Sequence, residues 1–154
     1  MTTVFVVAPI KGKVISLQEV PDPVFAQTLV GPGVAILPDP GPQIVLAPIS
    51  GRLLKLKPHA FVIANGREAV LVHLGIDTVL LNGAASALLA QEKQMVRAGE
   101  PIMRWDPDRV AEAGLSAICP VVALDAPLDA VTGAAEGDVD AGGELFHWSA
   151  GGLR

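Results

Sequence analysis

The sequence predicts an all-β protein, a compact antiparallel β-sandwich or barrel-like single domain with one or two short helices. Two observations support this fold class. First, 16 glycines and 13 prolines divide the 154 residues into short segments, and the runs between them are rich in β-branched and aliphatic residues. Short strands joined by turn residues give this pattern. Second, two stretches of the sequence recur, as expected when a turn and its following strand are used twice.

The expected strands cover residues 4–7, 14–17, 33–37, 43–46, 61–64, 69–72 and 78–81. A helix is expected over residues 84–94, which are rich in alanine and leucine, two good helix formers. A second, short helix is expected to begin at Asp106-Pro107, with Asp106 as the N-cap and Pro107 in the first turn.

The two internal repeats are interpreted as architecture and not as sites. Residues 8–17 return as residues 47–56, sharing Ala-Pro-Ile-x-Gly, a basic residue, two aliphatic residues and a leucine. Residues 96–105 resemble residues 139–148, each leading from Val-x-Ala-Gly to a tryptophan. Trp105 and Trp148 are therefore expected to be packing residues in matching places.

Size and composition narrow the classes of protein. A length of 154 residues suits one domain; we expect it to cover residues 1–150, with residues 151–154 as a flexible tail. The net charge of −5 argues against a nucleic-acid binder.

No apolar run approaches the length of a membrane span, and the apolar N-terminus lacks a basic leader, so we expect a cytoplasmic protein without direct membrane insertion. The charged fraction of only 18% suggests that a protein partner covers part of the surface.

The single cysteine, Cys119, lies in an apolar run. It excludes an internal disulfide and a cysteine-based zinc cluster. We expect a buried structural thiol.

Two histidines, His59 and His73, are the strongest candidates for chemistry. Asn65-Gly66 lies between them and predicts a tight hairpin turn. His73 follows Asn65 by eight residues and His59 precedes it by six, so the hairpin would bring the two rings close together. Asp77 could return to the His73 ring and fix its tautomer. The spacing alone permits a metal site, a catalytic dyad or a phosphoryl relay.

The third histidine, His147, has a different context. It precedes Trp148 and matches Arg104 in the second repeat. We expect it to be a solvent-facing strand residue without a role in the site.

The segment from His73 to Thr78, His-Leu-Gly-Ile-Asp-Thr, resembles the histidine motif of the glucose-type IIA component of the bacterial phosphoenolpyruvate-dependent sugar phosphotransferase system. The resemblance covers nearly the whole chain. Its further matches are Ala-Pro-Ile-x-Gly at 8–12, Val-Pro-Asp-Pro-Val-Phe at 20–25, Gly-x-Gly-Val-Ala-Ile at 31–36, Ala-Pro-Ile-Ser-Gly at 47–51, His-Ala-Phe at 59–61 and Pro-Val-Val at 120–122.

The resemblance implies a phosphoryl carrier with a shallow apolar active face. It implies that His73 accepts the phosphoryl group and that His59 stabilises it. Asp77 matches the acidic residue of the motif and Gly75 its glycine, while Val24 and Phe25 match residues of the docking face. The phosphoryl group would come from the phosphocarrier HPr and pass to a IIB domain. No cofactor is required, and the unphosphorylated form could also regulate transporters or enzymes.

One position departs from the family pattern. Members commonly carry a threonine two residues before the first histidine, and here that residue is Lys57. Lys57 could neutralise phosphoryl charge, but an exposed lysine on a turn is more often only solvated, and the sequence favours that interpretation.

The main alternative is a zinc site. His59, His73 and Asp77 supply ligand types that suit a zinc-dependent hydrolase. The histidine pair could instead hold a zinc ion against a carboxylate of a partner protein, which would make it an interaction module. Metal content after dialysis would separate these alternatives.

Overall fold

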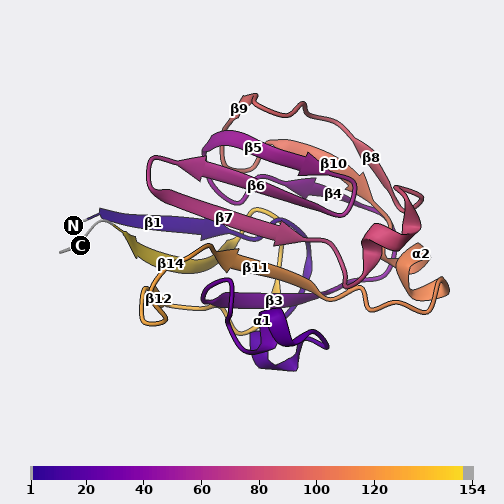
Figure 1. The fold of residues 1–154 in the computed structure, drawn as a ribbon, viewed down its shortest axis with the longest axis horizontal. Coiled ribbons are helices and arrows are strands. Elements are labelled where there is room, and N and C mark those ends of the chain that lie inside the picture. Colours follow the sequence, from indigo (N-terminus) through magenta and orange to yellow (C-terminus); the bar gives the residue numbers. More distant parts are fainter. Residues whose placement is uncertain (1, 151–154) are drawn as a thin grey trace.

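The computed structural model describes residues 2–150 (Figure 1). The paired strands described in the three sheets are antiparallel, and the helices are short, which confirms the predicted all-β class. Residues 151–154, the predicted tail, lie outside the described residues. The elements are β1 (Thr2–Val7), β2 (Gly12–Ser16), η1 (Leu17–Glu19), α1 (Pro23–Ala26), β3 (Gly33–Pro38), β4 (Gln43–Leu46), β5 (Gly51–Lys57), β6 (Ala60–Asn65), β7 (Glu68–His73), η2 (Thr78–Leu81), β8 (Ser86–Leu88), β9 (Met95–Val96), β10 (Pro101–Trp105), α2 (Pro107–Glu112), β11 (Cys119–Ala123), β12 (Val131–Thr132), β13 (Gly137–Val139) and β14 (Glu144–Ala150).

Most of the strands join one large sheet in the order β13-β2-β3-β11-β7-β6-β5-β9. Two smaller sheets, β1-β14-β12 and β4-β10-β8, complete the fold. In Figure 1, β5, β6 and β7 run side by side, and β7 ends on the side of the molecule away from the start of β1. No helix within residues 2–150 has the length and apolar character needed to cross a membrane.

The two faces of the large sheet bury different apolar clusters. Alternate residues of a strand face opposite sides, so Val70 and Val72 of β7 belong to the main core while Leu71 faces the other way. A smaller cluster covers that second face and includes residues of η1 and α1, among them Leu17 and Phe25. The second face therefore becomes partly covered by a short helical segment, and this is the face that carries the candidate site.

The internal repeats form a pseudo-symmetric framework, as predicted. The N–H of Gly142 donates to the carbonyl of Ala8 at 2.8 Å, and the N–H of Gly99 donates to the carbonyl of Ala47 at 2.8 Å. Each copy of the first repeat thus binds one copy of the second. Trp105 and Trp148 are both 2% exposed, so they are packing residues in both halves.

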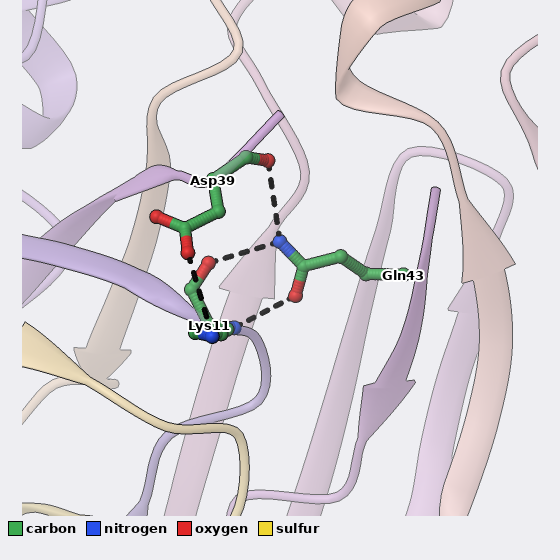
Figure 2. Close-up of polar contacts among 3 residues, drawn as sticks. All are labelled: Lys11, Asp39 and Gln43. Carbon is green, nitrogen blue, oxygen red and sulfur yellow. Dashed lines mark hydrogen bonds and ion pairs between the residues drawn. The ribbon is translucent and has the colours of Figure 1, made fainter. Parts of the chain in front are cut away.

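A side-chain amide ties the first repeat to the start of β4 (Figure 2). Gln43 accepts a hydrogen bond from the Lys11 N–H at 2.7 Å and donates one to the Lys11 carbonyl at 2.9 Å. The Lys11 ammonium lies 3.9 Å from the Asp39 carboxylate. The amide of Gln43 therefore satisfies both backbone groups of Lys11, as a neighbouring strand would.

The prediction of a helix over residues 84–94 is wrong. Ser86–Leu88 forms strand β8, which pairs with β10 and places Ala87 opposite Arg104. Gly83 and Lys93 have positive φ values of 85° and 78°, so left-handed turns flank the strand. Pairing with β10 outweighs the helical preference of alanine and leucine, which is a weak prior.

The prediction of a strand over residues 78–81 is also wrong, because these residues form the 3₁₀ helix η2. Asp77 and Asn82, which flank it, are both left-handed. The Thr78 hydroxyl donates to the Leu74 carbonyl at 2.8 Å and curls the chain back after β7. An extended strand is incompatible with these turns.

Two local predictions are confirmed. Helix α2 begins after Asp106, whose side chain accepts the N–H of Asp108 at 3.1 Å, with Pro107 in the first turn. Cys119 is fully buried in β11, and burial raises the pKa of its thiol, so it is a structural residue.

Candidate active site

The hairpin of β6 and β7 brings His59 and His73 together, as the sequence predicts. A two-residue turn follows Asn65, and the register runs on to Ala60 opposite His73. The N–H of Leu74 then donates to the carbonyl of His59 at 2.8 Å, which fixes the segment just before β6. The two imidazole rings have centroids 5.5 Å apart and an interplanar angle of 71°. One hairpin therefore presents two imidazoles as a pair.

The ring of His73 points away from the main core. Its neighbours Val72 and Leu74 are fully buried there, and strand alternation directs the histidine to the opposite face. On that face the Phe25 ring lies with its centroid 5.3 Å from that of His73 at an angle of 59°. Aromatic packing therefore limits the motion of the imidazole.

A backbone carbonyl fixes the tautomer of His73. Its Nδ1 lies 2.5 Å from the carbonyl oxygen of Gly75. A carbonyl can only accept, so Nδ1 carries the proton in the neutral ring and Nε2 keeps a free lone pair. The sequence suggested that Asp77 could do this, but the Gly75 carbonyl makes the contact instead. The Asp77 side chain is exposed, and the turn after β7 places the Gly75 carbonyl oxygen next to His73 Nδ1.

The loop after His73 depends on glycine and threonine. Gly75 has a φ of 84°, and a Cβ there would lie 2.6 Å from Cγ2 of Thr78 and 2.8 Å from the Ser116 carbonyl. The N–H of Ile76 donates to the same Ser116 carbonyl at 2.9 Å. Gly75 is therefore required both for its left-handed backbone and for the space it leaves.

The electrostatics favour neutral rings at neutral pH. Burial lowers the pKa of His73, opposed by the hydrogen bond to Gly75 and by the charges of Asp22 and Asp77. The pKa of His59 is also lowered, by burial first and then by His73 and Lys57. A neutral imidazole with an unprotonated Nε2 is a nucleophile.

The sequence pattern of the family described as "phosphoenolpyruvate-dependent sugar phosphotransferase system, EIIA 1" matches residues 4–127. The chain belongs to this family. The glucose-specific EIIA component of Oceanobacillus iheyensis is 38% identical over 120 residues, which cover 76% of this chain and 72% of that protein. The glucose permease IIA of Mycoplasma capricolum has a similar structure, with a TM-score of 0.87, 31% identity and 96% of each chain covered.

Some relatives carry this EIIA unit within a larger protein. The N-acetylglucosamine-specific EIICBA component of Klebsiella pneumoniae is 44% identical over 120 residues, which cover 75% of this chain and 18% of that protein. An EIIA is a phosphotransferase component that carries a phosphohistidine, so the histidine pair lies in a protein whose chemistry needs one.

The two expected docking residues of this EIIA differ in exposure. Val24 is 41% exposed and remains available to a partner. Phe25 is 5% exposed and packs beneath the surface against His73. Further exposed apolar side chains lie on Leu29 and on η2, at Val79 and Leu80. The segments that contain α1 and η2, which lie next to His73 and Gly75, therefore expose apolar side chains, and Phe25 supports the His73 ring.

Sequence reasoning did not identify Asp22 and Ser86 as site residues. Asp22 caps α1 by accepting the Val24 N–H at 2.9 Å, and its charge acts on His73. The Ser86 hydroxyl donates to the Pro58 carbonyl at 2.6 Å and thereby anchors the residue before His59. The Asp-Pro pair at 22–23 was a visible helix-start signal. No sequence signal pointed to Ser86, which comes from the misassigned segment 84–94.

The structure argues against the three-ligand zinc site that the sequence allowed. Within residues 2–150 no group of three or more His, Cys, Asp or Glu side chains is placed to hold a metal ion. His59, His73 and Asp77 therefore do not form the two-histidine, one-carboxylate site considered from the sequence. His147 lies apart, packed on Phe5 with a ring-centroid distance of 4.8 Å.

Proposed function

We propose that this EIIA accepts a phosphoryl group on Nε2 of His73 from the phosphohistidine of HPr and passes it to a cysteine of a IIB domain during sugar uptake. The observation that carries the proposal is the bond from His73 Nδ1 to the Gly75 carbonyl, because it leaves Nε2 unprotonated and directed away from the loop. The assignment to HPr and to these residues goes beyond family membership and is tested below.

In the first step, the Nε2 lone pair attacks phosphorus, and the bond between phosphorus and the donor nitrogen breaks. The electron pair of that bond returns to the donor imidazole, so atoms and charge balance without a cofactor. In the second step a thiolate attacks, and the Nε2–P electron pair returns to His73. Phosphoryl transfer of this kind has a loose transition state, so alignment and charge stabilisation matter more than proton transfer.

His59 has the position of a stabilising residue. Its ring stands beside that of His73 at a steep angle and is half-buried. A neutral His59 can donate an N–H to a phosphoryl oxygen on His73, and the hydrogen bond would fix the group for in-line transfer. Loss of His59 should therefore impair transfer more than uptake.

A IIB domain is the proposed acceptor because relatives join the domains in one chain. The Klebsiella pneumoniae and Corynebacterium glutamicum relatives are named as EIICBA and EIIBCA components. We place the reaction in the cytoplasm, where phosphoenolpyruvate is formed. The sugar would be selected by the membrane component and not by this chain.

The test is intact-mass analysis after incubation with phosphoenolpyruvate, enzyme I and HPr, on wild type, His73→Ala and His59→Ala. We expect wild type to gain one acid-labile phosphoryl group and His73→Ala to gain none. His59→Ala should gain one and transfer it to a IIB domain slowly. An unmodified wild type, or a phosphorylated His73→Ala, would contradict the proposal.

A further inference from the structure

Lys57 lies in register with His73. It is the last residue of β5 and pairs with Ala60 of β6, which pairs in turn with His73 of β7. Residues directly opposite each other on neighbouring strands project to the same side of a sheet. The buried Leu56 before it confirms that Lys57 faces away from the main core. Lys57 is therefore not a turn residue, and its side chain shares a face with His73.

The separation suits the length of a lysine. Neighbouring strands lie about 4.8 Å apart, so two steps place the backbones of Lys57 and His73 roughly 10 Å apart. A lysine has a flexible four-carbon stem that spans roughly 6 Å, and the imidazole extends from the other side. The residue between them is Ala60, whose single methyl group leaves the path over β6 open.

A nearby cation would stabilise phosphorylated His73, because the side-chain charges that act on this residue are negative. Asp22 and Asp77 both act on His73, and a phosphoryl group brings about two further negative charges. Lys57 is the cation whose charge is felt at the neighbouring His59. Among residues 2–150 the ion pairs are Lys11–Asp39 and Glu144–His147, so the Lys57 ammonium is in neither, although its charge also acts on the exposed carboxylate of Glu92.

We propose that Lys57 neutralises the phosphoryl group on His73, its ammonium crossing Ala60 to contact the phosphoryl oxygens. The inference rests on the proposed function and gives this chain a charged contact where the resemblance implies a threonine hydroxyl. It reverses the sequence interpretation of Lys57 as a merely solvated residue. Pairing with the ammonium stabilises the phosphorylated carrier relative to phosphorylated HPr.

The test compares Lys57→Met with Lys55→Met. Lys55 is a matched control, because it lies on the same strand and faces the same side but pairs with Val62, one row farther from His73. Each protein is equilibrated with HPr, enzyme I and phosphoenolpyruvate–pyruvate mixtures, and the phosphorylated fractions of both carriers are measured. We expect Lys57→Met to lower the transfer equilibrium constant roughly threefold to tenfold, and Lys55→Met to leave it within twofold of wild type.

Two further measurements keep the result specific. Lys57→Arg should retain most of the wild-type equilibrium constant, since it keeps the charge, and the deficit of Lys57→Met should shrink in about 1 M salt. An unchanged equilibrium constant for Lys57→Met, or equal losses in both methionine variants, would overturn the inference while leaving His73 as the carrier. Failure of wild type to take up phosphate would instead overturn the proposed function.

Discussion

The Nδ1 atom of His73 lies 2.5 Å from the carbonyl oxygen of Gly75, only two residues farther along the chain. The chain can turn back onto the His73 ring within two residues because Gly75 is left-handed, with a φ of 84°. The same residue that allows the turn thereby supplies the acceptor that fixes the tautomer. The proposed nucleophile, at the end of β7, and its orienting group therefore lie two residues apart in one continuous segment.

Replacing Gly75 by alanine should damage both stability and chemistry. The new Cβ would overlap Cγ2 of Thr78 and the Ser116 carbonyl, in addition to the cost of a left-handed alanine. We expect Gly75→Ala to lower the free energy of unfolding by about 3 kcal/mol, measured by urea denaturation. The phosphorylation rate of the folded fraction should also fall, because the carbonyl no longer meets Nδ1.

Gly66→Ala is the matched control. Gly66 is also left-handed, with a φ of 65°, but a Cβ there meets nothing within 4 Å. Gly66→Ala should lower the free energy of unfolding by about 1 kcal/mol, the cost of a left-handed alanine alone, and leave phosphorylation unchanged. Equal losses in the two variants would show that the contacts of Gly75 do not matter.

Thr78 should be a positioning residue for the same loop. Its side chain is 4% exposed, and its hydroxyl donates to the Leu74 carbonyl at 2.8 Å. Thr78→Val keeps the shape but removes the donor, which should cost about 1–3 kcal/mol and slow phosphorylation. Thr78→Ser keeps the hydroxyl and should keep the phosphorylation rate, even though it loses a buried methyl group. A Thr78→Val protein that is destabilised but phosphorylated at the wild-type rate would show a purely structural role.

The pairing of the histidines was predictable because local signals fix it. Asn65-Gly66 indicates a tight turn, and counting residues on either side of it brings His59 and His73 within a few positions of each other. The exact register was not predictable, because the two turn residues are Gly66 and Arg67, which sets Ala60 opposite His73. The framework of repeats was also visible, since Ala8 and Ala47 recur in the same motif. Their hydrogen bonds to Gly142 and Gly99 were not visible, because they join segments far apart in the chain.

The orienting group of His73 was not predictable for a related reason. A carboxylate three or four residues away is a common partner of histidine, and Asp77 suited that pattern. The actual partner, a carbonyl, depends on a left-handed Gly75 held by Ser116 from a distant segment. Strand β8 likewise depends on β10 and overrides the helical preference of residues 84–94. Both errors concern structure imposed by distant neighbours.

The pH dependence follows from the lowered pKa of His73. The folded protein releases its proton below the ordinary value of 6.5, so between the folded pKa and 6.5 the unfolded state binds more protons. The contribution of His73 to stability is therefore present above pH 6.5 and is lost as the pH falls through that window. Phosphoryl uptake, by contrast, should hold its rate through this window, because His73 of the folded protein stays neutral until the pH reaches its lowered pKa.

Asp22→Asn should lower the pKa of His73 further. The substitution removes a negative charge that raises this pKa, while asparagine can still cap α1 through its side-chain oxygen. An NMR titration of the imidazole protons measures the shift. Asp138→Asn is the control, because Asp138 lies on β13 and is not among the charges acting on His73. An unchanged His73 pKa in Asp22→Asn would show that solvent screens Asp22 completely.

Zinc should compete with the phosphoryl group and not assist it. With no third ligand grouped beside His59 and His73 among the described residues, the chain offers zinc at most an incomplete site. Zinc would also take the Nε2 lone pair that, in the proposed mechanism, attacks phosphorus. We therefore expect dialysis to remove added zinc, chelator to leave phosphorylation unchanged, and excess zinc to inhibit it. Zinc retained through dialysis at one ion per chain, and lost in His59→Ala, would instead indicate a resident metal site and contradict the carrier mechanism.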